Sequence, residues 1–300
     1  MTSRLSRRAL ISAMATGSLV AQQKKNVSAG YPPVMEGAVT EVYKKTPGAD
    51  LKLWMFQPAG HRASDKRAAI VFFFGGGWNG GSPKQFEQHS KHLASRGMVA
   101  IAADYRVNSR HGAKVIDCVR DAKSAIRYVR ANAKRLGIDA GRIAAGGGSA
   151  GGHLAAATGV IAGLDENSED TTISSKPNAM VMFNPALILA DAPEADFKLN
   201  SLSGVADRMG APPETLSPYH HIAKGAPPAI IFHGQADTTV PYKTAEAFTM
   251  KMKASGNRCE LVGYGGQAHG FFNFGRGNNE YFEKTLRRAT EFLEQIGYCT

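Results

Sequence analysis

The chain has 300 residues, of which 43% are hydrophobic, and its formal net charge is +11. This length and composition suffice for one large α/β domain or two smaller ones. The first 25 residues hold five of the positive charges and no acidic residue, and the remaining excess is spread without basic runs. That distribution is typical of a solvated surface and argues against a nucleic-acid-binding protein.

The N-terminal sequence predicts an export signal. Arg7 and Arg8 precede thirteen mostly apolar or small residues, 9–21, a run that is too short to span a bilayer. The paired arginines are similar to those of a twin-arginine signal, although an ordinary secretory signal or a disordered tail remain alternatives. We expect residues 1–21 to be removed, with cleavage as late as Ala29 left open, and the protein to be periplasmic or extracellular. No later segment is expected to insert stably in a membrane.

The rest of the chain alternates between apolar runs that are typical of strands and apolar residues at helical spacing. An opening hairpin is predicted at 38–45 and 51–58, around a turn at 47–50. The continuous apolar run 68–77 is typical of a strand buried on both faces. Further strands are expected at 98–106, 142–147, 178–185, 228–234 and 259–265, and helices at 84–96, 113–135, 150–162, 242–255 and 279–297.

This alternation predicts a single α/β domain over residues 30–300. We expect a mostly parallel central sheet of about eight strands, with helices on both faces and an antiparallel hairpin at its start. One segment, 186–227, has no clear periodicity and is rich in Pro, Asp, Ser and Gly. Because so long a loop in a compact domain is usually functional, we predict a short lid-like insertion there.

The three cysteines are odd in number, and none has the spacing of a metal site. Cys118 falls on the apolar side of the helix predicted at 113–135 and is expected in the core. A bridge between Cys259 and Cys299 is left open, because an exported protein can hold disulfides.

Chemically active residue types follow three of the predicted strands. In an open parallel sheet, ligands bind outside the carboxyl ends of the strands. Ser149 follows the strand at 142–147 within a G-x-S-x-G sequence, Asp237 follows the strand at 228–234, and His269 follows the last strand. The chain order Ser, Asp, His is the one associated with the α/β-hydrolase sheet.

These residue types can carry out nucleophilic catalysis together. A serine hydroxyl is a poor nucleophile at neutral pH, so His269 would accept its proton, and Asp237 would orient the imidazole. A tetrahedral oxyanion needs preorganised donors. The amide of Ala150 and a backbone amide of Gly75 or Gly76 are the candidates for that oxyanion hole.

The same residues allow other interpretations. The loop "GGGSAGG" also fits the dinucleotide pattern G-x-G-x-x-G, but half the chain precedes it and no acidic residue ends the next strand. His153 and His233 are rival bases, and Asp104 is a rival carboxylate, although each fits a structural role at its position. Trp78, Gly77 and His153 are candidates for the substrate pocket, with simple packing as the alternative.

At this point the sequence resembles the α/β-hydrolase superfamily, in particular bacterial esterases related to hormone-sensitive lipase and to acetylxylan/feruloyl esterases. The segments that carry the resemblance cover most of residues 68–272 and read "FFFGGGWNGGSP", "DYRV", "DAKSAIRYVRANAKRLGID", "GGGSAGGHLAA", "HGQADTTVP" and "AHGF". The resemblance implies ester hydrolysis through an acyl-enzyme on Ser149, assisted by Asp237 and His269, without a metal or organic cofactor.

The chain departs from that family pattern in two places. Phe74 stands where the family commonly has a histidine before the glycines, and residues 22–67 resemble a hairpin instead of a helical cap. We therefore expect an open site, which suits short acyl groups on a small-molecule or polysaccharide ester. A lipase or polyesterase, a prolyl-oligopeptidase-type peptidase and a non-catalytic binding module on the same scaffold remain alternatives. The oligomeric state is not indicated.

Overall fold

The computed structural model describes residues 30–198 and 206–299. The chain divides into two units, residues 1–36 and 37–300, and the second contains every helix and strand described below. The predicted export signal lies outside the described residues. Within the part that is described, no helix is both long enough and apolar enough to cross a membrane.

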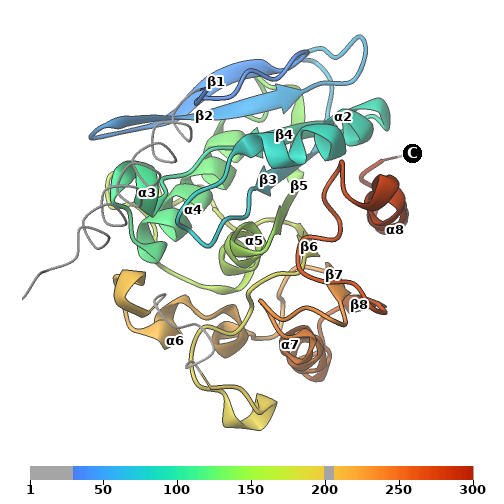
Figure 1. Ribbon diagram of the computed structural model, residues 1–300. Coiled ribbons are helices and arrows are strands. Elements are labelled where there is room, and N and C mark those ends of the chain that lie inside the picture. Colours follow the sequence, from blue (N-terminus) through green and yellow to red (C-terminus); the bar gives the residue numbers. More distant parts are fainter. Residues whose placement is uncertain (1–29, 199–205, 300) are drawn as a thin grey trace, which may run out of the picture. The chain divides into compact units, whose positions relative to one another are not determined.

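The second unit is built on an eight-stranded sheet with the order β1-β2-β4-β3-β5-β6-β7-β8 (Figure 1). The strands are β1 Val39–Thr46, β2 Ala49–Phe56, β3 Arg67–Phe73, β4 Val99–Ala103, β5 Ile138–Gly148, β6 Ala179–Phe183, β7 Ala229–Gly234 and β8 Cys259–Tyr264. β2 runs antiparallel to both β1 and β4, and the other neighbours are parallel. The predicted mostly parallel sheet and its opening hairpin are confirmed.

Helices cover both faces of this sheet. They are α2 Glu87–Ser95, α3 Asn108–His111, α4 Val115–Ala131, α5 Ala150–Val160, α6 Pro213–Leu216, α7 Tyr242–Ala254 and α8 Glu280–Gln295, with 3-10 turns η1 Pro83–Phe86, η2 Pro193–Ala195, η4 Ala206–Arg208, η5 Pro218–His221 and η6 Gly277–Asn279. Side chains of α4, α5 and α7 pack in one core layer, and those of α2 and α8 pack in the other.

β3 shows how the sequence divides between the two layers. Successive side chains of a strand point to opposite faces, so Val71 and Phe73 join the layer under α4 and α5, while Ile70 and Phe72 join the layer under α2 and α8. All four are at most 2% exposed. The continuous apolar run therefore does form a strand that is buried on both faces.

The cysteines follow the same division. Cys118 is fully buried, as expected, and all three cysteines are free. Cys259 belongs to the layer under α4, α5 and α7, whereas Cys299 packs against the layer under α2 and α8. The sheet lies between the two sulfur atoms, which is why the bridge left open above does not form.

The segment predicted as a lid-like insertion begins inside the core. Residues 186–190 are buried, and two backbone positions there are tied to the end of the insertion. The Leu189 amide donates to Oγ of Ser217 at 2.9 Å, and the Tyr219 amide donates to the Leu187 carbonyl at 3.0 Å. The two ends of the insertion are thus tied to each other, and its function as a lid stays a prediction.

Candidate active site

Ser149 occupies the sharp turn between β5 and α5. Its backbone has φ 54° and ψ −119°, a conformation that costs a non-glycine residue about 1–3 kcal/mol and persists only where the surroundings enforce it. A Cβ on Gly147 would lie 2.4 Å from the backbone of Gly151, and a Cβ on Gly151 would lie 1.9 Å from the Phe73 carbonyl oxygen. The turn therefore needs glycine on both sides of the serine.

The structure brings the three predicted catalytic side chains together. Nε2 of His269 lies 2.9 Å from Oγ of Ser149, and Nδ1 of His269 lies 2.7 Å from Oδ2 of Asp237. The other carboxylate oxygen of Asp237 accepts the amide N–H groups of Thr239 and Val240, each at 2.9 Å. The carboxylate is therefore fixed by its own loop before it meets the imidazole.

Asp237 is held as a carboxylate. Burial raises its pKa, but hydrogen bonds from His233 and His269 and the Val240 amide outweigh burial and hold the pKa well below its usual range. An ionised Asp237 accepts the Nδ1–H of His269. The tautomer that this bond selects leaves Nε2 free to accept the Ser149 hydroxyl proton.

His233, a rival base, and Asp104, the rival carboxylate, occupy structural positions. His233 is fully buried, its Nε2 lies 2.8 Å from the Val240 carbonyl oxygen and 3.4 Å from Oδ2 of Asp237, and it shapes the acid loop as expected. Oδ1 of Asp104 accepts the next amide, that of Tyr105, at 2.8 Å. Neither residue takes the place of a catalytic group.

Trp78 and His153 contact each other. Nε1–H of Trp78 donates to Nδ1 of His153 at 3.1 Å, and Nε2–H of His153 donates to the Leu216 carbonyl at 2.7 Å. Burial lowers the pKa of His153 to about 4 although the bond to Leu216 acts against this, so the imidazole is neutral. Both side chains are at most 4% exposed. The structure favours packing, the alternative to the predicted pocket role, because both side chains are buried and the ring nitrogens of Trp78 and His153 already have hydrogen-bond partners.

Gly77, the third candidate for the pocket, contributes through its backbone. Its carbonyl oxygen accepts Nη1–H of Arg208 at 3.1 Å, and Arg208 lies on η4 within the insertion. Its φ of 61° favours glycine. This contact links residues 75–77, here called the glycine loop, to the insertion.

The glycine loop lies directly beside the serine, because a Cβ on Gly75 would stand 3.3 Å from Cβ of Ser149. The Gly75 amide, however, donates to Oε1 of Gln85 at 2.6 Å. Within residues 30–198 and 206–299, the amides of Gly76 and Ala150 have no protein acceptor. Of the predicted oxyanion-hole donors, Gly76 and Ala150 thus remain available, and Gly75 is occupied.

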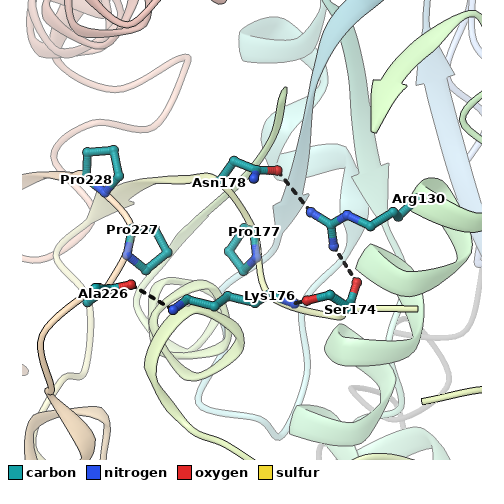
Figure 2. Close-up of a pocket in the computed structure, with 9 residues that line it drawn as sticks. Arg130, Ser174, Lys176, Pro177, Asn178, Ala226, Pro227 and Pro228 are labelled. Carbon is teal, nitrogen blue, oxygen red and sulfur yellow. Dashed lines mark hydrogen bonds between the residues drawn. The ribbon is translucent and has the colours of Figure 1, made fainter. Parts of the chain in front are cut away.

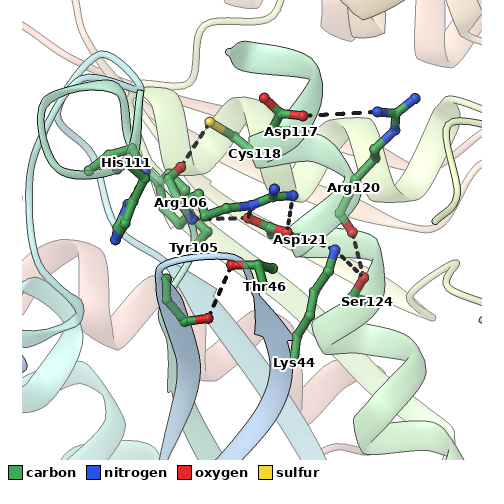
Figure 3. A network of polar contacts seen from close by, with 12 residues as sticks. Lys44, Thr46, Tyr105, Arg106, His111, Asp117, Cys118, Arg120, Asp121 and Ser124 are labelled. Atoms are coloured by element: carbon green, nitrogen blue, oxygen red, sulfur yellow. Dashed lines mark hydrogen bonds and ion pairs between the residues drawn. The ribbon is translucent and has the colours of Figure 1, made fainter. Parts of the chain in front are cut away.

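A buried ion network is centred on Asp121 (Figure 3). Asp121 on α4 is fully buried and accepts Nε–H and Nη2–H of Arg106 and Nζ–H of Lys44, each at 2.8 Å. Burial alone would lower the pKa of Arg106, but Asp121 outweighs it and raises the pKa. The segment that Arg106 anchors in turn holds the glycine loop, because the Asn108 amide donates to the Trp78 carbonyl at 3.0 Å.

Two residues near His269, Asn184 and Arg276, were not predicted. Asn184 immediately follows β6, is fully buried and has a φ of 34°. Its Oδ1 accepts a hydrogen bond from the Gly270 amide at 3.0 Å, and its Nδ2 lies 3.5 Å from Nε2 of His269. The guanidinium of Arg276 donates to the His269 carbonyl. A polar residue at the end of the predicted strand 178–185 was the available signal for Asn184. No comparable signal marks Arg276.

A cleft of about 370 Å³ lies away from these residues (Figure 2). Its lining includes Asn178 and Pro228, which immediately precede β6 and β7, and Nη2–H of Arg130 donates to Oδ1 of Asn178 at 2.9 Å. Amino ends of parallel strands face the opposite edge of a sheet from their carboxyl ends. The cleft is therefore on the edge opposite Ser149 and Asp237.

Strand order, serine turn and strand-end side chains together define an α/β-hydrolase fold. Residues 55–252 match the BD-FAE family, and the chain belongs to that family. These findings, with the esterases described next, confirm the resemblance to α/β-hydrolase superfamily esterases.

Solved structures of esterase 2 from Thermogutta terrifontis are similar along nearly their whole length. The apo form is 55% identical with a TM-score of 0.86, and the propionate-bound form is 55% identical with a TM-score of 0.85; each comparison covers 90% of this chain and 98% of the other. Esterase LipC of Mycobacterium tuberculosis is 31% identical over 67% of this chain and 52% of its own length. This chain thus spans about half the length of LipC.

Proposed function

We propose that this chain is a carboxylic ester hydrolase that works through Ser149, His269 and Asp237. One observation carries the proposal: His269 stands between the two others, 2.9 Å from the serine oxygen and 2.7 Å from the carboxylate. The nucleophile, the base and the group that orients the base are thus in hydrogen-bond contact in the order that acyl transfer requires. The esterases to which the chain is similar support the same reaction class.

In the first half of the reaction, Oγ of Ser149 attacks the ester carbonyl carbon while its proton passes to Nε2 of His269. The negative charge that develops on the carbonyl oxygen is held by the amides of Gly76 and Ala150, donors whose loss typically costs about 3–4 kcal/mol each in transition-state stabilisation. Asp237 stabilises the imidazolium that forms. The intermediate then collapses as the bond to the alcohol oxygen breaks, and His269 returns its proton to that oxygen.

In the second half, water replaces the alcohol. His269 accepts a proton from the water as its oxygen attacks the acyl carbon, and the same donors hold the second oxyanion. The bond to Oγ breaks, the serine regains its proton from His269, and the carboxylic acid leaves. The enzyme returns to its starting state, and no other reactant is consumed.

The neighbouring structures support a covalent step and small acyl groups. Thermogutta terrifontis esterase 2 has been solved phosphorylated by paraoxon, as well as with propionate and with butyrate bound. A serine activated as Ser149 is here would react with such an electrophile. We propose short acyl esters as substrates of this chain, including acetyl or feruloyl groups on sugars, and export as its cellular route.

The substrate proposal is tested by a screen across acetylated xylan, feruloyl esters and p-nitrophenyl esters of increasing acyl length. We expect turnover to be highest on the short acyl groups. Much faster cleavage of long-chain triglyceride would contradict this.

The catalytic residues are tested by substitution. Ser149→Ala should abolish hydrolysis and His269→Ala should nearly abolish it, whereas Gln57→Ala, at an exposed position just past β2, should leave it unchanged.

A further inference from the structure

A chain of side-chain amides joins the glycine loop to the loop that carries His269. The Gly75 amide donates to Oε1 of Gln85 at 2.6 Å, and Nε2–H of Gln85 donates to Oδ1 of Asn273 at 2.8 Å. Nδ2–H of Asn273 then donates to the Gly270 carbonyl at 2.8 Å. Gln85 lies on η1, 188 residues before Asn273. Three separate segments of the chain are therefore connected by three consecutive hydrogen bonds.

We call this chain of hydrogen bonds from Gly75 through Gln85 and Asn273 to Gly270 the relay. The groups at its two ends determine how the side-chain amides of Gln85 and Asn273 are oriented. Gly75 offers an N–H, which only the oxygen of Gln85 can accept, and Gly270 offers a carbonyl oxygen, which only the amide nitrogen of Asn273 can contact as a donor. Both side-chain amides therefore have one orientation that satisfies all their partners. Each side-chain amide accepts a hydrogen bond at its oxygen and donates one from its nitrogen, so the three bonds point the same way and each polarises the next.

The relay ends beside the groups that the proposed reaction uses. Gly75 immediately precedes Gly76, and a Cβ on Gly75 would lie 2.9 Å from the Gly148 carbonyl oxygen, so this part of the loop packs directly against the serine turn. Gly270 immediately follows His269, and its amide is held from the other side by Oδ1 of Asn184 at 3.0 Å. A change in the relay would displace the oxyanion donor and the base relative to each other.

We propose that Gln85 and Asn273 are positioning residues that set the distance between the oxyanion donors and His269. The inference rests on the proposed ester hydrolase function and extends it to residues outside the catalytic triad and the oxyanion donors. It predicts that breaking the relay lowers turnover more than substrate binding, because the misalignment matters most when charge develops in the transition state.

The test uses Gln85→Met, which keeps the length of the side chain and removes its hydrogen bonds, and Asn273→Leu at the other end. Gln57→Met is the matched control, because Gln57 is exposed and lies outside the site. On p-nitrophenyl acetate we expect kcat to fall about 10- to 100-fold in each relay variant, with KM within about twofold and the thermal midpoint nearly unchanged. The double variant should lose no more than the more damaged single variant, since either change already breaks the relay.

Three results would overturn the inference: a kcat of Gln85→Met within about twofold of wild type, losses that multiply in the double variant, or a lower thermal midpoint with unchanged kcat. If Gln85→Met does not fold, Asn273→Leu decides the question on the same terms. A wild-type enzyme that hydrolyses no ester would instead overturn the proposed function. Full turnover in both variants of an active enzyme overturns this inference alone.

Discussion

Nε2 of His233 lies 3.4 Å from Oδ2 of Asp237, the same oxygen that Nδ1 of His269 meets at 2.7 Å. One carboxylate oxygen therefore faces two imidazoles, one fully buried and one on the side of the serine. The buried histidine helps to keep Asp237 ionised without taking part in proton transfer.

His233→Phe is expected to lower stability in a pH-dependent way. A carboxylate whose pKa is lower in the folded state stabilises the fold above its unfolded pKa of about 3.9, and this contribution is lost as the pH falls through that value toward the folded pKa. Removing His233 diminishes the contribution by about 1–3 kcal/mol at pH 7, the usual cost of a lost hydrogen bond to a buried charged group. Phenylalanine preserves the edge-on ring contact with Tyr242.

Urea unfolding of the wild type and of this variant at several pH values measures the effect. The difference in free energy of unfolding should be full above pH 5 and should shrink below pH 4, with these bounds taken from the unfolded pKa of about 3.9. A difference that is constant across this range would mean that His233 stabilises the fold through packing and its hydrogen bond to the Val240 carbonyl, without acting on the ionisation of Asp237.

Asp237→Asn should reduce kcat about 10⁴-fold, because the neutral amide no longer selects the tautomer that leaves Nε2 free. Stopped-time assays with p-nitrophenyl acetate measure the loss. The rival carboxylate provides the comparison: Asp104→Asn should cost stability and much less turnover, since Oδ1 of Asp104 contacts the Tyr105 amide. The opposite ranking of the two variants would reassign the acid.

Trp78→Phe should destabilise the fold and leave substrate binding nearly unchanged. The change removes the donor to Nδ1 of His153, a fully buried atom, at a cost of about 1–3 kcal/mol in the free energy of unfolding. KM for p-nitrophenyl acetate and p-nitrophenyl butyrate is the second measurement. A large rise in KM with unchanged stability would return Trp78 to the substrate pocket.

Asp121→Asn should be strongly destabilising, by about 3–5 kcal/mol, because Arg106 loses the carboxylate that it contacts at 2.8 Å and Lys44 loses one of its two carboxylate partners, Glu166 being the other (Figure 3). Denaturant unfolding measures this directly. Glu280→Gln is the control, since the Glu280–Lys284 pair is solvent-exposed on α8 and should leave the denaturant midpoint unchanged. Equal effects of the two changes would contradict the supporting role of Asp121.

The catalytic candidates could be predicted because their signals are local. Apolar runs mark the strands, and in a parallel sheet the carboxyl ends of the strands meet at one edge, so Ser149, Asp237 and His269 were expected together. The glycines around Ser149 are likewise a local requirement of its turn. Fold class and catalytic candidates thus follow from patterns that are a few residues long.

The remaining parts of the site depend on contacts between distant segments. Gln85 and Asn273 are 188 residues apart, and nothing in either neighbourhood indicates their hydrogen bond or the occupied amide of Gly75. The burial of His153 depends on the Leu216 carbonyl of the insertion, a segment without periodicity. β5 starts at Ile138, earlier than predicted, because Ile138 pairs with Arg67 of β3.

A covalent probe tests most directly whether Ser149 is the nucleophile. Wild-type protein and Ser149→Ala are incubated with a fluorophosphonate probe, and the adduct is located by peptide mass spectrometry. We expect one probe per wild-type chain, on the peptide that contains Ser149, with loss of ester hydrolysis in proportion to labelling and no adduct on Ser149→Ala. Labelling that persists in Ser149→Ala, or a wild-type adduct on another residue with hydrolysis intact, would contradict the assignment.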